Sequence, residues 1–169
     1  LETRSVADSL NDILRLGQLL DKNEAASTIV ADIKAQLALI AEKIDRIPEN
    51  QRKRVMRLMG RDAIMTPGRD SFQNELIRAA GGITHDFQET GQVIPVSLEQ
   101  WQAFNPQFLY GCGGDRKVAE TFFSMPGWQG VDAAISHSIA FFPCDLTCRA
   151  STHTSDFVSW LASVIYTDA

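Results

Sequence analysis

The stretch that decides the fold is Lys22–Arg46, KNEAASTIVADIKAQLALIAEKIDR, which Ile47 and Pro48 follow. Apolar residues recur in it and just beyond it at spacings of three and four, the pattern of one helix face; they are Ile29, Ile33, Leu37, Ile40, Ile44 and Ile47. A helix of about 25 residues is about 37 Å long at 1.5 Å per residue. Pro48 ends it, because proline cannot continue a helix.

Upstream of this helix, the sequence predicts a shorter one, whose apolar positions are Val6, Leu10, Ile13, Leu14 and Leu20. Gly17 weakens that helix, and residues 21–23 break it. The pair is read as a spine or strut, with a helical hairpin or a coiled coil as alternatives. A coiled coil fits less well because the heptads are not sustained and lack flanking charges. The helical segment therefore covers residues 1–47, and an α/β unit covers residues 48–169.

Downstream of Pro48, strand and helix patterns alternate. Strands are expected at 55–59, 107–110 and 139–142, helices at 72–80, 98–104, 117–123 and 152–166, and a loop at 84–95. This order predicts a mostly parallel sheet with helices on both faces. The expected fold class is therefore α/β, a long N-terminal spine helix followed by a mostly parallel sheet flanked by helices.

Three local predictions can be checked in the structure. Asp70 with Gln73, and Ser97 with Gln100, have the spacing of helix capping boxes. The last helix should bury one apolar face, formed by Phe157, Trp160, Leu161 and Val164.

Composition narrows the function. The chain has 169 residues, a formal charge of −5 and 44% hydrophobic residues, which favours one globular domain with an appendage over a disordered chain. The acidic balance argues against nucleic acid as a partner. No stretch reaches the roughly 18 apolar residues of a membrane helix, and the beginning does not resemble a signal peptide. Because it starts at Leu1 inside a helical pattern, we expect a piece of a longer protein.

Catalytic and metal motifs are scarce. The sequence has no His-x-x-x-His pair and no Gly-x-Ser-x-Gly elbow. The spacing of Cys112, Cys144 and Cys148 is not that of a zinc site, and these residues allow either one disulfide and a thiol or three thiols. No catalytic residue and no metal ligand is therefore predicted.

Loops after the strands are the better candidates, because open α/β sheets bind ligands there. Gly111–Gly114 is either a phosphate-cradling loop or a tight turn, and it lacks the fingerprints of known nucleotide loops. Arg69 and Arg149 could each hold a carboxylate or phosphate, or else pair with Asp70 and Asp145. 

Five segments, in order, resemble the second half of helical-backbone (class III) periplasmic substrate-binding proteins, the cobalamin and ferric-siderophore type that serves ABC importers. They are Asn11–Gly17 with the isoleucine-striped helix, Asp70–Ile77 with Ala80–Gly82, Pro95–Gln100, Asn105–Tyr110, and Phe142–Leu146 with Arg149–Ser151. The resemblance covers nearly the whole chain. Gln107 and Thr152 depart from it, since the family often has Asp and Pro there, and a first lobe is missing.

The resemblance implies a binding module and not an enzyme. It would be the C-terminal lobe of a periplasmic or membrane-anchored extracytoplasmic protein, without a resident cofactor, that captures a corrinoid, haem or ferric siderophore for an ABC transporter permease. The implied ligand contacts are Arg69, Phe87, Gln92, Cys112, Gly113, Gly114, Asp145 and Arg149. Glu99, in the family's Val-Ser-x-Glu run, would be the acidic residue that docks on the permease.

The periplasmic address implied by the resemblance is oxidising, so one disulfide is expected. Cys112–Cys144 is the preferred pairing because both residues end strands at one sheet edge. The alternative function is a cofactor- or metal-cluster-binding enzyme subunit that uses Cys112, Cys144 and Cys148. The apolar stripe of the spine is expected to make the isolated chain self-associate.

Overall fold

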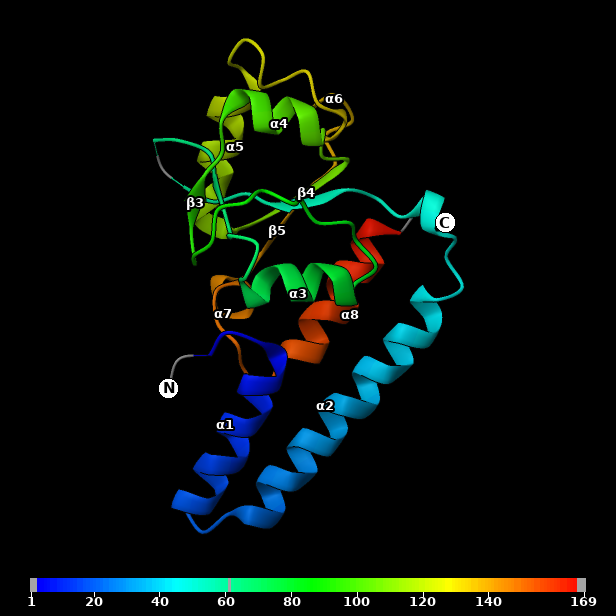
Figure 1. The fold of residues 1–169 in the computed structure, drawn as a ribbon, viewed down its shortest axis with the longest axis vertical. Coiled ribbons are helices and arrows are strands. Elements are labelled where there is room, and N and C mark those ends of the chain that lie inside the picture. The colour runs from blue at the N-terminus through cyan, green and yellow to red at the C-terminus, as the bar shows by residue number, and fades with distance from the viewer. Residues whose placement is uncertain (1–2, 61, 167–169) are drawn as a thin grey trace.

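The computed structural model describes residues 3–60 and 62–166 (Figure 1). Its helices are α1 (Val6–Leu19), α2 (Asn23–Ile44), α3 (Phe72–Ala79), α4 (Leu98–Phe104), α5 (Arg116–Phe123), α6 (Asp132–Ile135), α7 (Cys144–Thr147) and α8 (Thr154–Ile165). Its strands are β1 (Val55–Arg57), β2 (Met65–Thr66), β3 (Ile94–Pro95), β4 (Phe108–Cys112) and β5 (Ile139–Phe142), with 3-10 turns η1 (Glu49–Gln51) and η2 (Gly113–Asp115).

The first two helices form a hairpin that extends away from the sheet (Figure 1). Leu10 of α1 packs between Val30 and Ile33 of α2. A Cβ at Gly17 would lie 2.4 Å from the Cβ of Ala26, so glycine lets the two helices approach closely. The second half of α2 continues upward and packs on α8, which makes α2 both one arm of a hairpin and a strut along the lobe.

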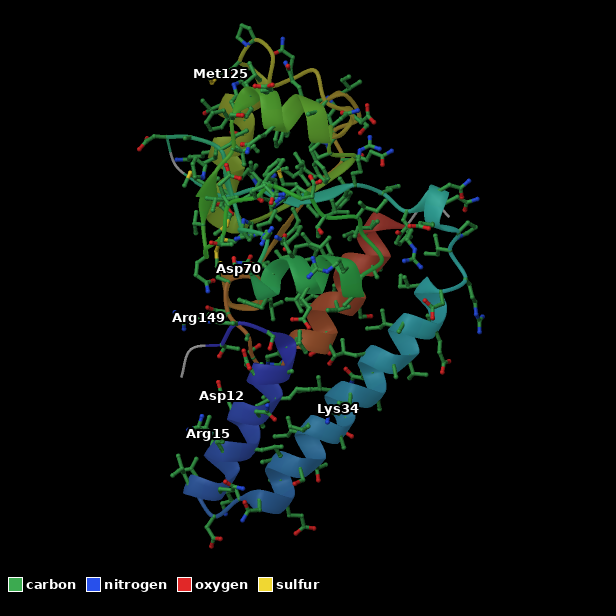
Figure 2. The ribbon with its side chains drawn as sticks, viewed as in Figure 1. Asp12, Arg15, Lys34, Asp70, Met125 and Arg149 are labelled. Atoms are coloured by element: carbon green, nitrogen blue, oxygen red, sulfur yellow. A yellow bond between two sulfur atoms is a disulfide. The ribbon has the colours of Figure 1, made fainter. Side chains whose placement is uncertain are left out.

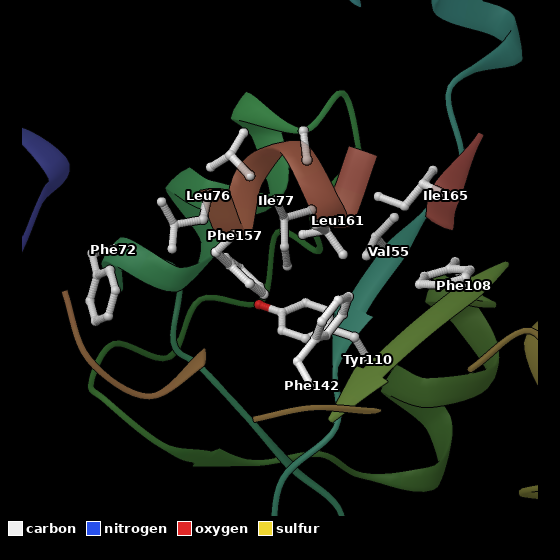
Figure 3. Packing of buried hydrophobic residues seen from close by; sticks show 12 residues of the cluster. Val55, Phe72, Leu76, Ile77, Phe108, Tyr110, Phe142, Phe157, Leu161 and Ile165 are labelled. Atoms are coloured by element: carbon white, nitrogen blue, oxygen red, sulfur yellow. The ribbon is translucent and has the colours of Figure 1, made fainter. Parts of the chain in front are cut away.

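The predicted parallel sheet is confirmed. Its strand order is β1-β4-β5, and both pairings are parallel. On one face, Val55 and Tyr110 pack against α3 and α8, around Leu76, Phe157 and Leu161 (Figure 3). On the other face, a second cluster joins the sheet to α4, α5 and α6; it contains Met56, Leu109, Trp101, Phe122 and Ala133. Alternate residues of each strand therefore face two cores.

Several local predictions need correction. Residues 84–95 were expected to form a loop, but Ile94–Pro95 is a strand, β3, that pairs antiparallel with β2. Strands of two residues give no periodic signal. The helix α3 is capped by Ser71 and not by Asp70, whose carboxylate instead accepts a 2.8 Å hydrogen bond from the Gly91 amide.

Of the other two local predictions, one is confirmed and one is wrong in part. At α4 the capping box is present, since Ser97 and Gln100 each accept a hydrogen bond from the other's backbone amide. In α8, Phe157 and Leu161 are buried and Val164 is partly buried, but Trp160 is 50% exposed, so its inward placement was wrong. Tryptophan is frequently only partly buried because it is large. Within the described ranges, none of the helices has the length and apolar character to span a bilayer.

Candidate functional site

The three parallel strands end at one edge of the sheet, on the side of the lobe where α7 lies (Figure 1). Residues after β4 and β5 meet there, since the register places Cys112 beside Phe142. This strand-end edge comprises Arg57, Cys112–Arg116 and Pro143–Arg149. It brings together five of the predicted ligand contacts: Cys112, Gly113, Gly114, Asp145 and Arg149.

A disulfide joins Cys112, the last residue of β4, to Cys144, the first residue of α7. The preferred pairing is therefore confirmed, and Cys148 keeps a free, exposed thiol. The metal-cluster alternative required three available thiols at this edge. Because two of the three sulfurs are bonded to each other, that alternative loses its donor set.

Arg57 is a residue that the sequence analysis missed. It lies in β1 and is 1% exposed, yet it carries a charge. Its Nη2 lies 3.5 Å from the Asp115 carboxylate and 3.5 Å from the Cys148 sulfur, and its guanidinium stands 5.4 Å from the centre of the Tyr110 ring. A buried cation needs such a partner. The signal was an arginine inside an otherwise apolar strand.

The glycine turn after β4 has one crowded position and two open ones. A Cβ at Gly111 would come within about 3 Å of Asp115 and Phe141, whereas added Cβ atoms at Gly113 and Gly114 would meet nothing within 4 Å among the described residues. Asp115 holds the turn by accepting a 2.8 Å hydrogen bond from the Cys112 amide. The backbone at Gly113 and Gly114 therefore stands clear of neighbouring side chains.

Arg116, also missed, lies two residues after Gly114 and begins α5. Its guanidinium lies 4.4 Å from the centre of the Phe141 ring, a cation–π contact that holds the side chain in place. Arg116 is exposed, so this contact presents a positioned cation beside the strand-end edge. An arginine two residues after a pair of glycines was the available signal.

Arg69 and Gln92 lie beside a different feature, a polar hollow of about 390 Å³. Its lining comprises Thr3, Arg4, Asp70, Ser71, Thr90, Gly91 and Gln92. Arg69 donates to the side-chain oxygen of Gln88 at 3.1 Å and does not pair with Asp70. Asp70 and Arg149 lie on the same side of the lobe (Figure 2).

Of the remaining predicted site residues, Phe87 packs against other aromatic rings and Glu99 lies at the start of α4. Phe87 stacks on His85 with ring centres 4.2 Å apart and meets Phe104 edge-on, so part of its ring is used in packing. Glu99 is exposed in the first turn of α4, on the sheet face opposite α3 and α8. There it complements the helix dipole.

His85 predicts a pH dependence of stability. The ring is buried, and its two nitrogens lie 3.0 Å from the Pro67 carbonyl and 3.4 Å from the Phe87 amide, which suits a neutral ring that donates once and accepts once. Burial lowers the pKa of His85 below its ordinary 6.5, against the opposing effects of the Pro67 hydrogen bond, Asp86 and Glu89. As pH falls through 6.5, the unfolded chain binds this proton first, so the free energy of unfolding should decline and then level off below the folded-state pKa.

Urea unfolding between pH 7.5 and pH 5 measures this effect. In His85→Gln the part of the pH slope that begins near 6.5 should disappear. In the control His137→Asn it should remain, because His137 is exposed and asparagine tolerates its positive φ of 53°. An unchanged slope in His85→Gln would refute the assignment.

Comparison with known proteins assigns this chain to a family. The family model described as "Periplasmic binding protein" matches residues 1–146. Comparison with curated protein sequences gives no match.

Solved structures share the fold over almost the whole chain. The periplasmic heme-binding protein RhuT from Roseiflexus sp. RS-1 is 22% identical, with a TM-score of 0.85 over 97% of this chain and 64% of that one. A periplasmic binding protein from Veillonella parvula is 19% identical, with a TM-score of 0.86 over 96% and 57%. The periplasmic vitamin B12 binding protein BtuF of Vibrio cholerae is 17% identical, with a TM-score of 0.80 over 98% and 63%.

At these identities the likeness shows the fold alone. The chain spans less than two thirds of the length of each of these three proteins. The family match agrees with the parallel sheet and with the long helix α2. The chain therefore belongs to the periplasmic binding protein family, as a member of its helical-backbone class.

Proposed function

We propose that this chain is the C-terminal lobe, with the connecting helix, of an extracytoplasmic protein that binds a small metal-chelate ligand and delivers it to an ABC importer. The strand-end edge carries this proposal. It combines an open glycine turn, a disulfide and a positioned Arg116 at the carboxyl ends of parallel strands, the usual ligand side of such sheets. Such a lobe binds and releases its ligand without chemical change, so it is not an enzyme.

The ligand classes in question are a corrinoid, a haem and a ferric siderophore. Solved structures with this fold include a heme-binding protein, a vitamin B12 binding protein and a protein of an Fe3+-hydroxamate transport system. The exposed cations Arg116 and Arg149 favour a ligand with carboxylate groups, because guanidinium pairs well with carboxylate. A haem has two such groups, which makes it the first ligand to test.

A second lobe would complete the binding cleft. Apolar side chains exposed on the hairpin support this part of the proposal; they are Leu16, Leu19, Leu20, Ile29 and Leu39. Another lobe could cover them, and without it a second copy of the chain could do so. Glu99, on the opposite face from α8, is proposed as the charge that docks on the permease.

Calorimetric titration with haem, cyanocobalamin and a ferric hydroxamate tests the proposal. We expect measurable but weak binding to this chain and stronger binding to a two-lobe version, because the second lobe supplies the other half of the contacts. Equal affinity of the two versions for every ligand would contradict the cleft model.

The variant Arg116→Gln tests whether the strand-end edge binds the ligand. It should weaken binding of the preferred anionic ligand about tenfold, the equivalent of one charge-assisted hydrogen bond. The matched control is Arg15→Gln on α1, whose guanidinium lies 3.9 Å from the Asp12 carboxylate and does not belong to the strand-end edge. An effect as large in Arg15→Gln would mean that overall charge, and not the edge, attracts the ligand.

A further inference from the structure

All three cysteines lie at the strand-end edge. The Cys112–Cys144 disulfide joins β4 to α7, and Cys148 is the residue that caps the other end of α7 through its backbone amide. The Cys148 amide donates to the Cys144 carbonyl at 3.0 Å, so the two residues are one helical turn apart. Side chains at this spacing share a helix face, with Cβ atoms about 5–6 Å apart. The free sulfur therefore stands within a side-chain rotation of a disulfide sulfur.

A buried guanidinium contacts the free sulfur. Arg57 is 1% exposed, and its Nη2 lies 3.5 Å from the sulfur of Cys148. Its Nε and Nη1 are buried without a hydrogen-bond partner within residues 3–60 and 62–166, and its Nη2 is shared between the Cys148 sulfur and the Asp115 carboxylate. Only the thiolate attacks a disulfide, and a guanidinium at this distance attracts negative charge on sulfur. Arg57 thus holds a buried cation against the sulfur that would attack.

The surroundings of the Cys112 sulfur suit a leaving group. The Asp115 amide donates a hydrogen bond to the sulfur of Cys112. The Asp115 carboxylate is occupied elsewhere, by the Cys112 amide at 2.8 Å and by Arg57 at 3.5 Å. A negative charge released on the Cys112 sulfur would therefore meet a backbone donor, with the nearby carboxylate already paired.

We propose that the three cysteines form a thiol–disulfide exchange site in which Cys148 is the attacking thiol. The Cys148 thiolate attacks the sulfur of Cys144, a Cys144–Cys148 bond forms, and the Cys112–Cys144 bond breaks. The electron pair leaves on Cys112, whose sulfur takes up a proton equivalent to the one that Cys148 gave up. The number of disulfides and thiols is unchanged, so the step needs no external oxidant or reductant.

The two disulfides have different structural effects. Cys112–Cys144 fastens the glycine turn after β4 to the segment after β5, whereas Cys144–Cys148 lies within a single helical turn and constrains neither strand. Exchange would release the turn and uncover a thiol at Cys112, next to the open Gly113 and Gly114. Any effect on ligand affinity rests on the proposed function, but the exchange itself does not.

Slow alkylation of the folded protein tests the exchange without any ligand. The protein is held at pH 8 with limiting iodoacetamide, quenched with acid, digested with trypsin and mapped by mass spectrometry without reduction. Cleavage at arginine and lysine separates Cys112, in peptide 79–116, from Cys144 and Cys148, both in peptide 118–149. We expect label on Cys112 as well as on Cys148, with the unlabelled pair of the Cys112-labelled molecules joined inside peptide 118–149.

Three variants give this test its controls. Cys148→Ser should take up no label, because it has no attacking thiol and its disulfide stays intact. Arg57→Met should label Cys112 about tenfold more slowly than the parent, and Arg57→Lys, which keeps the charge, should restore much of the rate. Label confined to Cys148 in the parent would overturn the proposal, and label on Cys144 would overturn the direction of attack. Equal rates of Cys112 labelling in the parent and in Arg57→Met would show that Arg57 has no part in the exchange.

Discussion

Replacing Trp101 with alanine is expected to lower the free energy of unfolding by about 3–5 kcal/mol. The side chain is fully buried between α4 and the sheet. Its ring packs on Trp128 with centres 5.7 Å apart, and its Nε1–H donates to the Trp128 carbonyl at 3.0 Å. Alanine would leave a cavity and an unpaired carbonyl, so packing and hydrogen bonding are both lost.

Urea unfolding followed by far-UV circular dichroism measures this loss. Trp160→Ala is the matched control, because Trp160 is half exposed on α8 and should cost less than about 1 kcal/mol. Trp101→Phe should fall between them, since it keeps much of the apolar volume and loses the donor. If the two alanine variants were equally stable, the second core would not depend on Trp101.

Removing the disulfide is expected to have the second large effect. The double variant Cys112→Ser, Cys144→Ser should lose about 3–4 kcal/mol of unfolding free energy, because the bridge closes a loop between residues 32 positions apart. The loss arises from greater freedom of the unfolded chain, so the native fold should persist.

The comparison variant is Cys148→Ser, which keeps the bridge and should change stability by no more than about 0.5 kcal/mol. Equilibrium unfolding of all three proteins without reductant gives the values. Reductant should lower the stability of the parent and of Cys148→Ser towards that of the double variant. A double variant as stable as the parent would show that the bridge does not limit the unfolded chain.

Local signals account for the parts of the fold that the sequence predicted well. The isoleucine stripe, the breaker at 21–23 and the Ser97–Gln100 box each depend on neighbours within four residues, and each is present in the structure. By contrast, β2 and β3 depend on pairing between residues almost thirty positions apart. Asp70 was assigned as a cap by its spacing, but the Gly91 loop, distant in sequence, uses its carboxylate.

In the candidate site, too, some features could be predicted from the sequence and others could not. The glycine turn and the Cys112–Cys144 pairing were predictable because parallel strands must end at one edge. Arg57 was not, because a buried cation is tolerated only where a partner such as Asp115 arrives from another segment. Arg116 became a candidate only when β5 placed the Phe141 ring beneath it.

By itself, the sequence determined the fold class, the long helix and the meeting of the residues after β4 and β5 at one edge of the sheet. Periodicity, caps and turns are short-range properties, and the direction of parallel strands follows from their alternation with helices. Only the tertiary structure decided which cation faces the free sulfur of Cys148. The contact of Arg57 with Cys148 joins residues 91 positions apart, and no local pattern encodes such a contact.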